Sequence, residues 1–390
     1  MVQAKGPLGD LNGDYRVDRV DLALFAGQWL APESPNADLN GDGYVDVFDL
    51  ALLADHWREA RCPIVINELL AHSHDTAPDW IELHNLSSAA VHVGGWLLSD
   101  NKNDLYRYRI ADGTIIDPHG YLVLYEDVNF GNPLDPGTLN PFKMSENGES
   151  LYLYSGSDTV FPEYLMEEKF GSSETWVSFG RYVKSTGTYN FVRLSEPTPG
   201  HANAYPLVGP VIINEIMYRP STDSDAEYVE LLNISGGPVT LFDFGSLEPW
   251  RFTDDAGIEF SFPADIPITL GTGEHVLLAR DASLVRTFFN VPASARVYQW
   301  TSGRLANSTE KIRLLQPGDV DEQGTRYWIE GDRVSYSDGS HGQDFADGID
   351  PWPREADGLG LSLNRRAPTR YGNDPNNWEA AIPSPGSAND

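Results

Sequence analysis

The sequence predicts a mainly β protein, in which a small helical module precedes two β-sandwiches in tandem. Three observations lead to this fold class. An acidic loop occurs twice within the first 60 residues, and a short helical pattern of apolar residues follows each copy. From Cys62 onward, short alternating segments are separated by Gly, Pro, Asn and Asp, which is typical of strands and turns. These strand segments then occur a second time in the same order.

The two acidic loops span residues 10–21 (DLNGDYRVDRVD) and 38–49 (DLNGDGYVDVFD). Each places oxygen-bearing side chains at loop positions 1, 3, 5, 9 and 12, and position 7 is free to offer a backbone carbonyl. This spacing wraps a chain around Ca²⁺, a hard cation that takes about six to eight oxygen ligands. Without a cation, so many carboxylates in one tight turn would repel one another. The sequence therefore predicts calcium as a cofactor.

A short helix is expected after each loop, but none before the first. The apolar residues that follow the loops recur at three- and four-residue steps, as on one helix face: Leu22, Phe25 and Trp29, then Leu50, Leu53 and Trp57. An EF-hand also needs a helix before each loop. Here only residues 1–9 precede the first loop, and the Pro-containing segment 31–37 precedes the second. The duplicated loop-helix unit over about residues 7–60 resembles a type I dockerin, a calcium-folded module that binds a cohesin domain.

The resemblance implies a ligand set for two calcium sites and a cohesin-type protein partner. The implied ligands are Asp10, Asn12, Asp14, the Arg16 carbonyl, Asp18 and Asp21 in the first loop, and Asp38, Asn40, Asp42, the Tyr44 carbonyl, Asp46 and Asp49 in the second. Loop position 6, a sharp turn that favours Gly, is Gly43 in the second loop but Tyr15 in the first. A side chain at positive φ costs about 1 kcal/mol, so we expect the first site to bind calcium more weakly.

Loop positions 10 and 11, which commonly help to choose the cohesin in this family, are Arg19-Val20 and Val47-Phe48. The two copies differ there, and neither is the Ser-Thr pair of well-known cellulosomal examples. The sequence therefore identifies neither the cohesin nor a symmetric binding mode.

Composition excludes several classes of partner. The formal net charge is −31, and residues 1–60 hold eleven acids against four bases. Such a surface repels phosphate backbones and anionic lipids, so nucleic acid is not an expected partner. No apolar run approaches the roughly 18 residues of a membrane span. No signal-peptide pattern opens the sequence, so for a secreted protein, as dockerin proteins usually are, we expect a mature or truncated form. The single cysteine, Cys62, is interpreted as a small apolar residue.

The β region repeats five motifs in order. The matched pairs are IVINEL (64–69) with VIINEI (211–216), WIELHNL (80–86) with YVELLNI (228–234), YLVLY (121–125) with HVLLA (275–279), ESLYL (149–153) with EKIRL (310–314), and TPGHAN (198–203) with SPGSAN (384–389). The offset grows from 147 to 186 residues, so the second copy carries insertions, chiefly around 316–350. We expect domains at 1–61, 62–206 and 207–390.

These motifs resemble the lamin tail domain, an immunoglobulin-like β-sandwich also found in secreted bacterial proteins. The markers are the opening INE strand, the [WY]-[IV]-E-L-x-N strand and the closing PG-x-A-N. The second copy adds VSY (334–336), PWP (351–353) and ADGLGLSL (356–363), which occur in bacterial members. The resemblance covers about 62–204 and 208–390 and implies two immunoglobulin-like sandwiches. The alternation of residues 80–84 fits a half-buried strand of such a sheet.

Two groups of carboxylates and histidines admit both a catalytic or metal-binding interpretation and a structural one. Glu68/Glu215 and Glu82/Glu230 recur in both copies and could form a glycosidase pair. Because both copies share them, we favour a structural role, such as accepting hydrogen bonds from loop amides. The second group consists of His72, His74, Asp75 and Asp79. It could form a transition-metal site or simply a solvated loop. The second copy has no histidine there, so the solvated loop is favoured.

The aromatic and remaining acidic residues give two further alternatives. A carbohydrate-stacking platform could be built from Trp250, Trp300, Trp328 or Trp352, although most aromatic residues alternate with aliphatic ones as in a sandwich core. The tract DFADGID (344–350) could hold another calcium ion, but it lacks the loop spacing and is better interpreted as a solvated face.

The sequence favours a protein that connects other molecules. It has no G-x-S-x-G elbow, H-E-x-x-H pair, P-loop or dinucleotide-binding motif. Two sandwiches occupy about 330 residues and leave little chain for a catalytic domain. We expect a non-catalytic, extracellular or cell-surface assembly or adhesion protein, whose sandwiches are spacers or bind a polysaccharide or cell-surface ligand. A dockerin-bearing polysaccharide hydrolase and a carbohydrate-binding module in polysaccharide catabolism are the alternatives.

Overall fold

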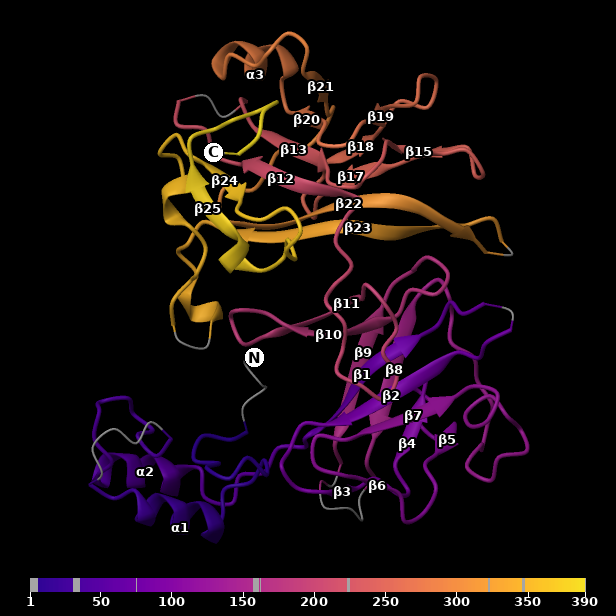
Figure 1. Ribbon diagram of the computed structural model, residues 1–390, viewed down its shortest axis with the longest axis vertical. Helices are drawn as coiled ribbons and strands as arrows, with labels where there is room; N and C mark the ends of the chain where they lie inside the picture. Colours follow the sequence, from indigo (N-terminus) through magenta and orange to yellow (C-terminus); the bar gives the residue numbers. More distant parts are fainter. Residues whose placement is uncertain are drawn as a thin grey trace. The chain divides into compact units, whose positions relative to one another are not determined.

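The computed structural model describes residues 6–30, 36–74, 76–156, 161, 163–222, 225–321, 323–345 and 348–389. The chain divides into two compact units: the first comprises residues 1–170, 175–183 and 187–205, and the second comprises residues 171–174, 184–186 and 206–390. The first unit holds the helical module and one β-sandwich, and the second unit holds the other β-sandwich (Figure 1).

The helical module consists of α1 (Arg19–Gly27) and α2 (Val47–Asp55). Each helix begins within its acidic loop, at loop position 10, because the aspartate at position 9 caps it: Asp18 accepts a hydrogen bond from the Val20 amide, and Asp46 accepts one from the Phe48 amide. The last acid of each loop completes a capping box. The loop and the start of the helix are therefore one unit, built from the same carboxylates.

The core of the helical module is small, and the predicted apolar faces are only partly buried. The buried residues are Val17, Phe25, Ala37, Val45 and Leu53. Leu22, Trp29 and Trp57, which the sequence places on the same faces, are exposed. Two nine-residue helices cannot cover a complete apolar face of one another, so part of each apolar face stays accessible to solvent.

The first sandwich packs a five-stranded antiparallel sheet against a four-stranded one. The five-stranded sheet has the order β11 (Tyr189–Arg193), β10 (Phe179–Val183), β1 (Ile64–Leu70), β2 (Trp80–Asn85), β7 (Tyr121–Tyr125). The four-stranded sheet has the order β5 (Tyr108–Arg109), β4 (Leu97–Ser99), β8 (Glu149–Tyr154), β9 (Leu165–Phe170). A short pair, β3 (Val91–His92) and β6 (Ile115–Ile116), completes it. Trp96 lies fully buried in the core.

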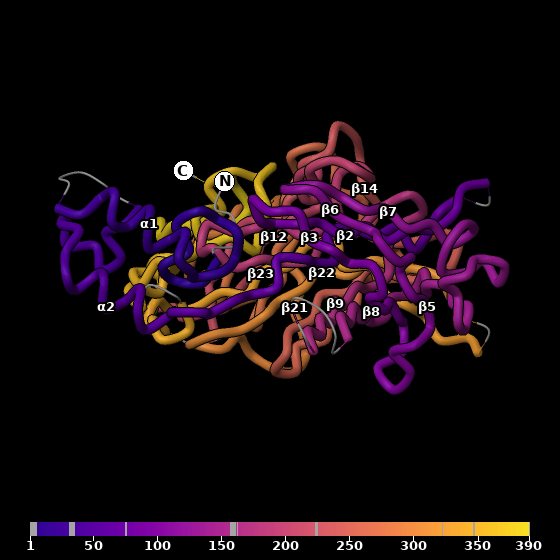
Figure 2. Tube along the Cα trace, turned by 90° about the horizontal axis from the view of Figure 1, so that it is seen from below, coloured from indigo at the N-terminus to yellow at the C-terminus, as the bar shows by residue number. Residues whose placement is uncertain are grey.

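The second sandwich repeats this plan with additions. Its larger sheet has the order β21 (Arg296–Gln299), β20 (His275–Ala279), β13 (Tyr228–Asn233), β12 (Val211–Met217), β24 (Ser362–Arg365), β25 (Trp378–Ala381). The opposing sheet has the order β18 (Glu259–Ser261), β17 (Arg251–Thr253), β22 (Thr309–Val320), β23 (Arg326–Ser337). The long strands β22 and β23 run side by side (Figures 1 and 2).

Shorter elements surround these sheets. They are the strand pairs β14 (Val239–Thr240) with β19 (Thr269–Leu270) and β15 (Phe242–Asp243) with β16 (Glu248–Pro249), the helix α3 (Ala282–Phe288), and the 3-10 turns η1 (Gly342–Asp344), η2 (Arg354–Ala356) and η3 (Pro375–Asn377).

The duplication is visible in the register of the strands. In the first copy β1 pairs with β2 across a register shift between Ile66 and Glu68. In the second copy β12 pairs with β13 across the same shift, between Ile213 and Glu215. The shift recurs at the INE motif, so the repeated sequence encodes a repeated bulge. The predicted fold class, two tandem immunoglobulin-like β-sandwiches preceded by a small helical module, is confirmed.

Candidate functional site

Each acidic loop is wound around its own side chains. In the first loop, Asp10 accepts hydrogen bonds from the amides of Gly13 at 2.8 Å and Tyr15 at 2.9 Å. Asp21, at the end of the same loop, accepts from the amides of Leu11 and Asp18, both at 2.8 Å. The first and last carboxylates thus both turn into the loop, as ligands of one central ion must do.

The second loop repeats this arrangement bond by bond. Asp38 accepts from the amides of Gly41 and Gly43, both at 2.8 Å. Asp49 accepts from the amides of Leu39 at 2.7 Å and Asp46 at 2.9 Å. The two loops therefore have the same conformation despite their different residues at position 6.

The middle ligand positions behave alike in both loops. Asn12 accepts from the Asp14 amide at 3.1 Å, and Asp14 accepts from the Arg16 amide at 2.9 Å. In the second loop Asn40 accepts from the Asp42 amide, and Asp42 accepts from the Tyr44 amide, both at 2.9 Å. The side chains at positions 3 and 5 are thereby held in the turn.

The carboxylates of the loops suit a calcium ion. Asp21 and Asp49 are fully buried. Within the part of the chain that the structure describes, no lysine or arginine pairs with an acid of either loop. Buried carboxylates are normally paired with a cation or bound to a metal. The pKa of Asp10 is raised, by burial first and also by the charges of Asp14 and Asp21, against the lowering effect of the backbone amides. A cation that neutralises the cluster would relieve this repulsion.

Position 6 has the predicted backbone conformation in both loops. Gly43 has φ of 91°, and Tyr15 has φ of 67°, so a tyrosine occupies the left-handed region. The structure also shows what offsets the strain, because the Tyr15 side chain is only 6% exposed. Burial of an aromatic ring stabilises by more than the positive φ costs.

The first loop contacts the sandwich of its own unit. Ser88 donates a hydrogen bond from its amide to the Gly13 carbonyl and from its hydroxyl to the Asn12 carbonyl, both at 2.9 Å. The guanidinium of Arg16 lies over the Phe161 ring at 5.4 Å from its centroid. The second loop instead presents apolar side chains to solvent: Tyr44 is 69% exposed and Phe48 is 66% exposed. The two halves of the module therefore differ in what remains accessible.

The repeated glutamates of the sandwiches hold the closing segment of each copy. Glu68 accepts from the Thr198 amide at 2.9 Å, and Glu82 accepts from the Gly200 amide at 2.5 Å. The second copy matches, since Glu215 accepts from the Ser384 amide at 3.1 Å and Glu230 from the Gly386 amide at 2.6 Å. All four glutamates are fully buried. The structural interpretation, acceptors for loop amides, is confirmed.

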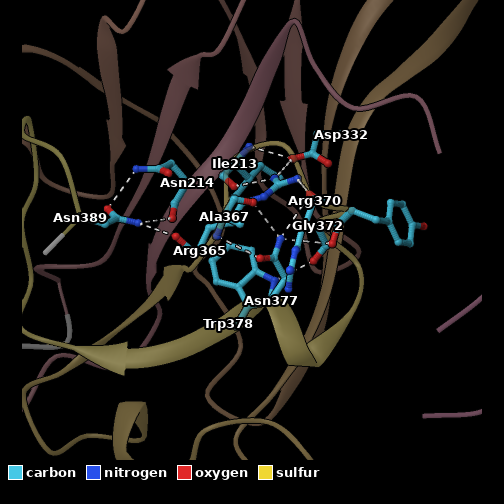
Figure 3. A network of polar contacts seen from close by, with 11 residues as sticks. Ile213, Asn214, Asp332, Arg365, Ala367, Arg370, Gly372, Asn377, Trp378 and Asn389 are labelled. Atoms are coloured by element: carbon cyan, nitrogen blue, oxygen red, sulfur yellow. Dashed lines mark hydrogen bonds and ion pairs between the residues drawn. The ribbon is translucent and has the colours of Figure 1, made fainter. Parts of the chain in front are cut away.

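An asparagine completes each closing segment. Asn67 donates to Asn203 at 2.6 Å, and in the second copy Asn214 donates to Asn389 at 3.0 Å. Asn389 in turn donates to the carbonyls of Asn214 and Arg365 (Figure 3). The INE and PG-x-A-N motifs are thus two sides of one hydrogen-bonded clasp, which explains why they recur together.

The histidine-rich loop does not bring its described residues together as a metal site. His72 approaches Thr175 at 3.0 Å, and His74 stacks on Trp176. Asp79 is buried and accepts from the Ser73 amide at 3.2 Å. Asp75 lies outside the described residues. Over the described residues, one group of three potential ligands converges, and it is a different one: Asp338, His341 and Asp350. The sequence singled out only Asp350 of this group, as part of the tract 344–350, because the group lies in an insertion of the second copy.

The tryptophans considered for a carbohydrate platform are mostly core residues. Trp250, Trp300 and Trp352 are all buried in the second sandwich. Trp328 is half-buried, and the guanidinium of Arg251 lies 3.9 Å from its ring centroid. In the tract 344–350, Asp350 accepts from Ser337 and from the Trp352 amide, while residues 346 and 347 lie outside the described residues.

These features define a tandem β-sandwich protein whose copies are closed by an INE-to-PGxAN clasp, preceded by a duplicated acidic loop-helix module. The family model of the lamin tail domain matches residues 58–164 and 206–336, and the type I dockerin domain matches residues 8–57. The chain belongs to the lamin tail domain family and carries a type I dockerin domain. As a class, such dockerins bind calcium and dock onto cohesins, and they occur in extracellular proteins.

Comparisons with curated proteins and with solved structures do not narrow the function further. No curated protein matches the chain. A solved structure of a DUF4876 family protein from Bacteroides thetaiotaomicron is similar at 10% identity, over 62% of this chain and 88% of its own, with a TM-score of 0.29. A similarity of this size supports no conclusion about fold or function. Among the described helices, none has the length and apolar character to cross a membrane.

Proposed function

We propose that this chain is a non-catalytic, extracellular assembly protein that docks through its dockerin onto a cohesin-type partner. The observation that carries the proposal is the pair of matched loops, whose buried carboxylates Asp21 and Asp49 have no basic partner among the described residues. The two lamin tail sandwiches would serve as spacers or as binding modules for a polysaccharide or cell-surface ligand. The proposed domains are 1–61, 62–206 and 207–390.

Two calcium ions are proposed, one in each loop. The first would be held by Asp10, Asn12, Asp14, the Arg16 carbonyl, Asp18 and Asp21, and the second by Asp38, Asn40, Asp42, the Tyr44 carbonyl, Asp46 and Asp49. The strained backbone at Tyr15 favours weaker binding in the first loop. Calcium would neutralise each cluster, so that metal binding and ordering of the loop-helix unit are coupled.

The second half of the module is the proposed docking face. Tyr44, Val47 and Phe48 are between 59% and 69% exposed and belong to the second loop. Clustered exposed apolar side chains mark interaction surfaces. The first loop is partly occupied by contacts with Ser88 and Phe161 of the neighbouring sandwich. This asymmetry supports docking mainly through α2 and its loop.

Calcium titration of the full chain by calorimetry tests the proposal. We expect two binding events, with Asp42→Ala removing the tighter one and Asp14→Ala removing the weaker one. Chelation with EDTA should also change the fluorescence of the half-exposed Trp29 and Trp57 and abolish capture of the cohesin partner. Absence of calcium uptake, or a helical module unchanged by EDTA, would contradict the proposal.

A polysaccharide array with detection of reducing sugars tests the role of the sandwiches separately. Retention without sugar release would identify ligand-binding modules, and neither retention nor release would leave the spacer role. Release of sugar would identify a polysaccharide hydrolase and overturn the non-catalytic proposal.

A further inference from the structure

The two sandwiches differ at one edge of their larger sheets. The strands β7 and β20 carry the matched segments YLVLY (121–125) and HVLLA (275–279). In the first sandwich β7 is an edge strand, and its neighbour in the sheet is β2. In the second sandwich β20 lies between β13 and a further strand, β21, which runs parallel to it (Figure 1). The second copy therefore has a strand in a place where the described part of the first copy has none.

The added strand belongs to the connection that follows β20. Between β20 and β22, the chain of the second copy forms α3 and then β21. The matched connection of the first copy, from β7 to β8, is described throughout and forms neither a helix nor a strand. The first copy thus keeps the strand that receives β21, but its own connection supplies no strand to pair with it.

The hydrogen bonds at both ends of β7 show which of its backbone groups point away from β2. The Asn85 amide donates to the Gly120 carbonyl at 3.0 Å, and the Glu126 amide donates to the Asp79 carbonyl at 2.9 Å. Because residues along an antiparallel strand alternate in the direction of their backbone groups, the even-numbered residues of β7 bond to β2. The odd-numbered residues therefore turn their amides and carbonyls outward, to the edge of the sheet.

Two of these outward residues have free backbone groups. Tyr125 confirms the direction, because Asn129 bonds to its amide at 2.9 Å and to its carbonyl at 2.7 Å. Within the described chain, nothing bonds to the outward amide and carbonyl of Tyr121 or of Val123. In the second copy this edge is in use, since the Ala279 carbonyl accepts from the Trp300 amide at 3.0 Å. Tyr121 and Val123 thus offer a donor and an acceptor each to a further strand.

The side chains at the two edges also differ in burial. Val276 and Leu277 of β20 are fully buried. Their counterparts in β7, Leu122 and Val123, are only half-buried, although Leu122 packs against the sandwich core. The edge of the first sandwich therefore leaves apolar surface accessible that the second sandwich covers.

The strand β21 covers this surface on both faces of the sheet. Tyr298 packs against the main core of the second sandwich. Val297 packs on the opposite face, in a small cluster with Leu277 and with Val285 of α3. Because side chains alternate along a strand, any segment that repeats this cover needs apolar residues on both of its faces.

The charges beyond β7 favour a segment that ends in a basic residue. Glu126 and Asp127 follow β7 directly. Glu126 pairs with Lys143 at 3.0 Å, whereas Asp127 is exposed and has no ion pair with any described residue. A parallel strand would place its C-terminal end on this side, where a lysine or arginine would complement the charge of Asp127.

We propose that β7 is a docking site for an extended segment of a partner polypeptide, which joins the sheet as a parallel strand in the place that β21 holds in the second sandwich. Strand addition takes its affinity from main-chain hydrogen bonds and its selectivity from alternate side chains. The segment that fits is apolar on both faces and basic at its C-terminal end. The site does not involve the dockerin, so its failure would leave the proposed cohesin docking unaffected.

Fluorescence anisotropy with the full chain in calcium tests the proposal. The probe is a labelled peptide of residues 294–300 followed by a lysine, SARVYQWK. We expect saturable binding with a dissociation constant of about 1 mM or tighter. In β21 the Trp300 amide bonds to β20, and by alternation so does the amide of Tyr298. N-methylation of these two amides in the peptide should abolish binding, whereas N-methylation of Val297 and Gln299 should leave it within about threefold.

Val123→Pro is the matched change in the chain. Proline removes the outward amide of Val123 but none of the bonds from β7 to β2, and edge strands tolerate it. The variant should weaken binding at least about tenfold, as expected for loss of a ladder hydrogen bond. Val123→Ala keeps the amide and should change the affinity by less than about threefold. The pair of methylated peptides supplies the test if Val123→Pro fails to fold.

Three outcomes would overturn the proposal. If the peptide shows no saturable binding, or if the two methylated peptides bind equally, β7 does not take up a strand through its backbone. If Val123→Pro binds the peptide as well as the unchanged chain does, the peptide lies elsewhere, for example in exchange with β21. Sedimentation of the full chain supplies the third: a dimer that Val123→Pro dissolves would assign the edge to a second copy of this chain.

Discussion

The Arg365 guanidinium donates to the Asp332 carboxylate at 2.6 Å, and both side chains are almost completely buried in the second sandwich. Arg365 also donates to the carbonyls of Ile213 and Arg370, at 3.0 and 2.6 Å (Figure 3). Asp332 accepts a further bond from the Ile213 amide at 2.9 Å. One ion pair therefore joins β12, β23 and β24 across the two sheets.

Arg365→Met is predicted to destabilise the second sandwich by about 3–5 kcal/mol, because it leaves the Asp332 carboxylate buried without a cation. The matched control is Arg304→Met, which removes an ion pair with Asp225 whose side chains are about half exposed. That change should cost about 0–1 kcal/mol. Urea unfolding of the full chain measures both. Similar losses for the two variants would contradict the prediction.

Tyr15→Gly is predicted to destabilise the helical module even though it relieves a strained backbone. Removing the side chain at positive φ gains about 1 kcal/mol, whereas loss of a buried aromatic ring costs about 3–5 kcal/mol. Tyr44→Ala, at an exposed position of the second loop, should change stability by less than about 0.5 kcal/mol. Denaturant titration in calcium compares them. A gain in stability for Tyr15→Gly would show that strain outweighs burial.

The second sandwich is predicted to lose stability as the pH rises towards 8, because of Glu230. Burial, with a further contribution from Glu215, raises the pKa of Glu230 from 4.5 to about 8. Between these values the folded chain retains a proton that the unfolded chain has released. The stabilising contribution is therefore complete below the unfolded pKa and is lost as the pH approaches the folded one.

Thermal unfolding at a series of pH values measures this effect, with Glu230→Gln as the variant. The variant should show a smaller fall in Tm over this range, whatever its absolute stability. Glu82→Gln is the matched change in the first sandwich, where the pKa of Glu82 is raised to about 7. The stability that the protonated Glu82 contributes should therefore be lost at a lower pH than that of Glu230. An unchanged pH dependence in Glu230→Gln would assign the loss of stability to other groups.

Phe48→Ala is predicted to weaken docking to the cohesin partner without changing calcium binding. Phe48 is exposed at position 11 of the second loop, and its side chain is not a proposed ligand. An aromatic anchor at the centre of an interface typically contributes about 2 kcal/mol or more. Leu134→Ala removes an exposed apolar side chain from the first sandwich and should have no effect on docking. Equal effects of the two variants in a binding assay would place the docking face elsewhere.

The loops and the sandwiches were predictable from sequence for different reasons. A calcium ion imposes fixed ligand spacings on a continuous segment, so the residues from Asp10 to Asp21 carry their own signature. The sandwiches were predictable because the chain repeats them, and the recurring INE and PG-x-A-N motifs form one contact in each copy.

What could not be predicted depends on contacts between distant or unrepeated residues. Exposure of Trp29 and Trp57 follows from how little surface two short helices bury, which periodicity does not reveal. The Asp338, His341 and Asp350 group lies in an insertion without a counterpart in the first copy.

The clasp between Asn67 and Asn203, and between Asn214 and Asn389, brings the start and the end of each sandwich to one place. A module whose two ends converge can be added to a chain, removed from it or inserted within a loop with little rerouting of its neighbours. The sandwich is therefore a self-contained module, and the sequence of each copy can diverge without disturbing the other copy.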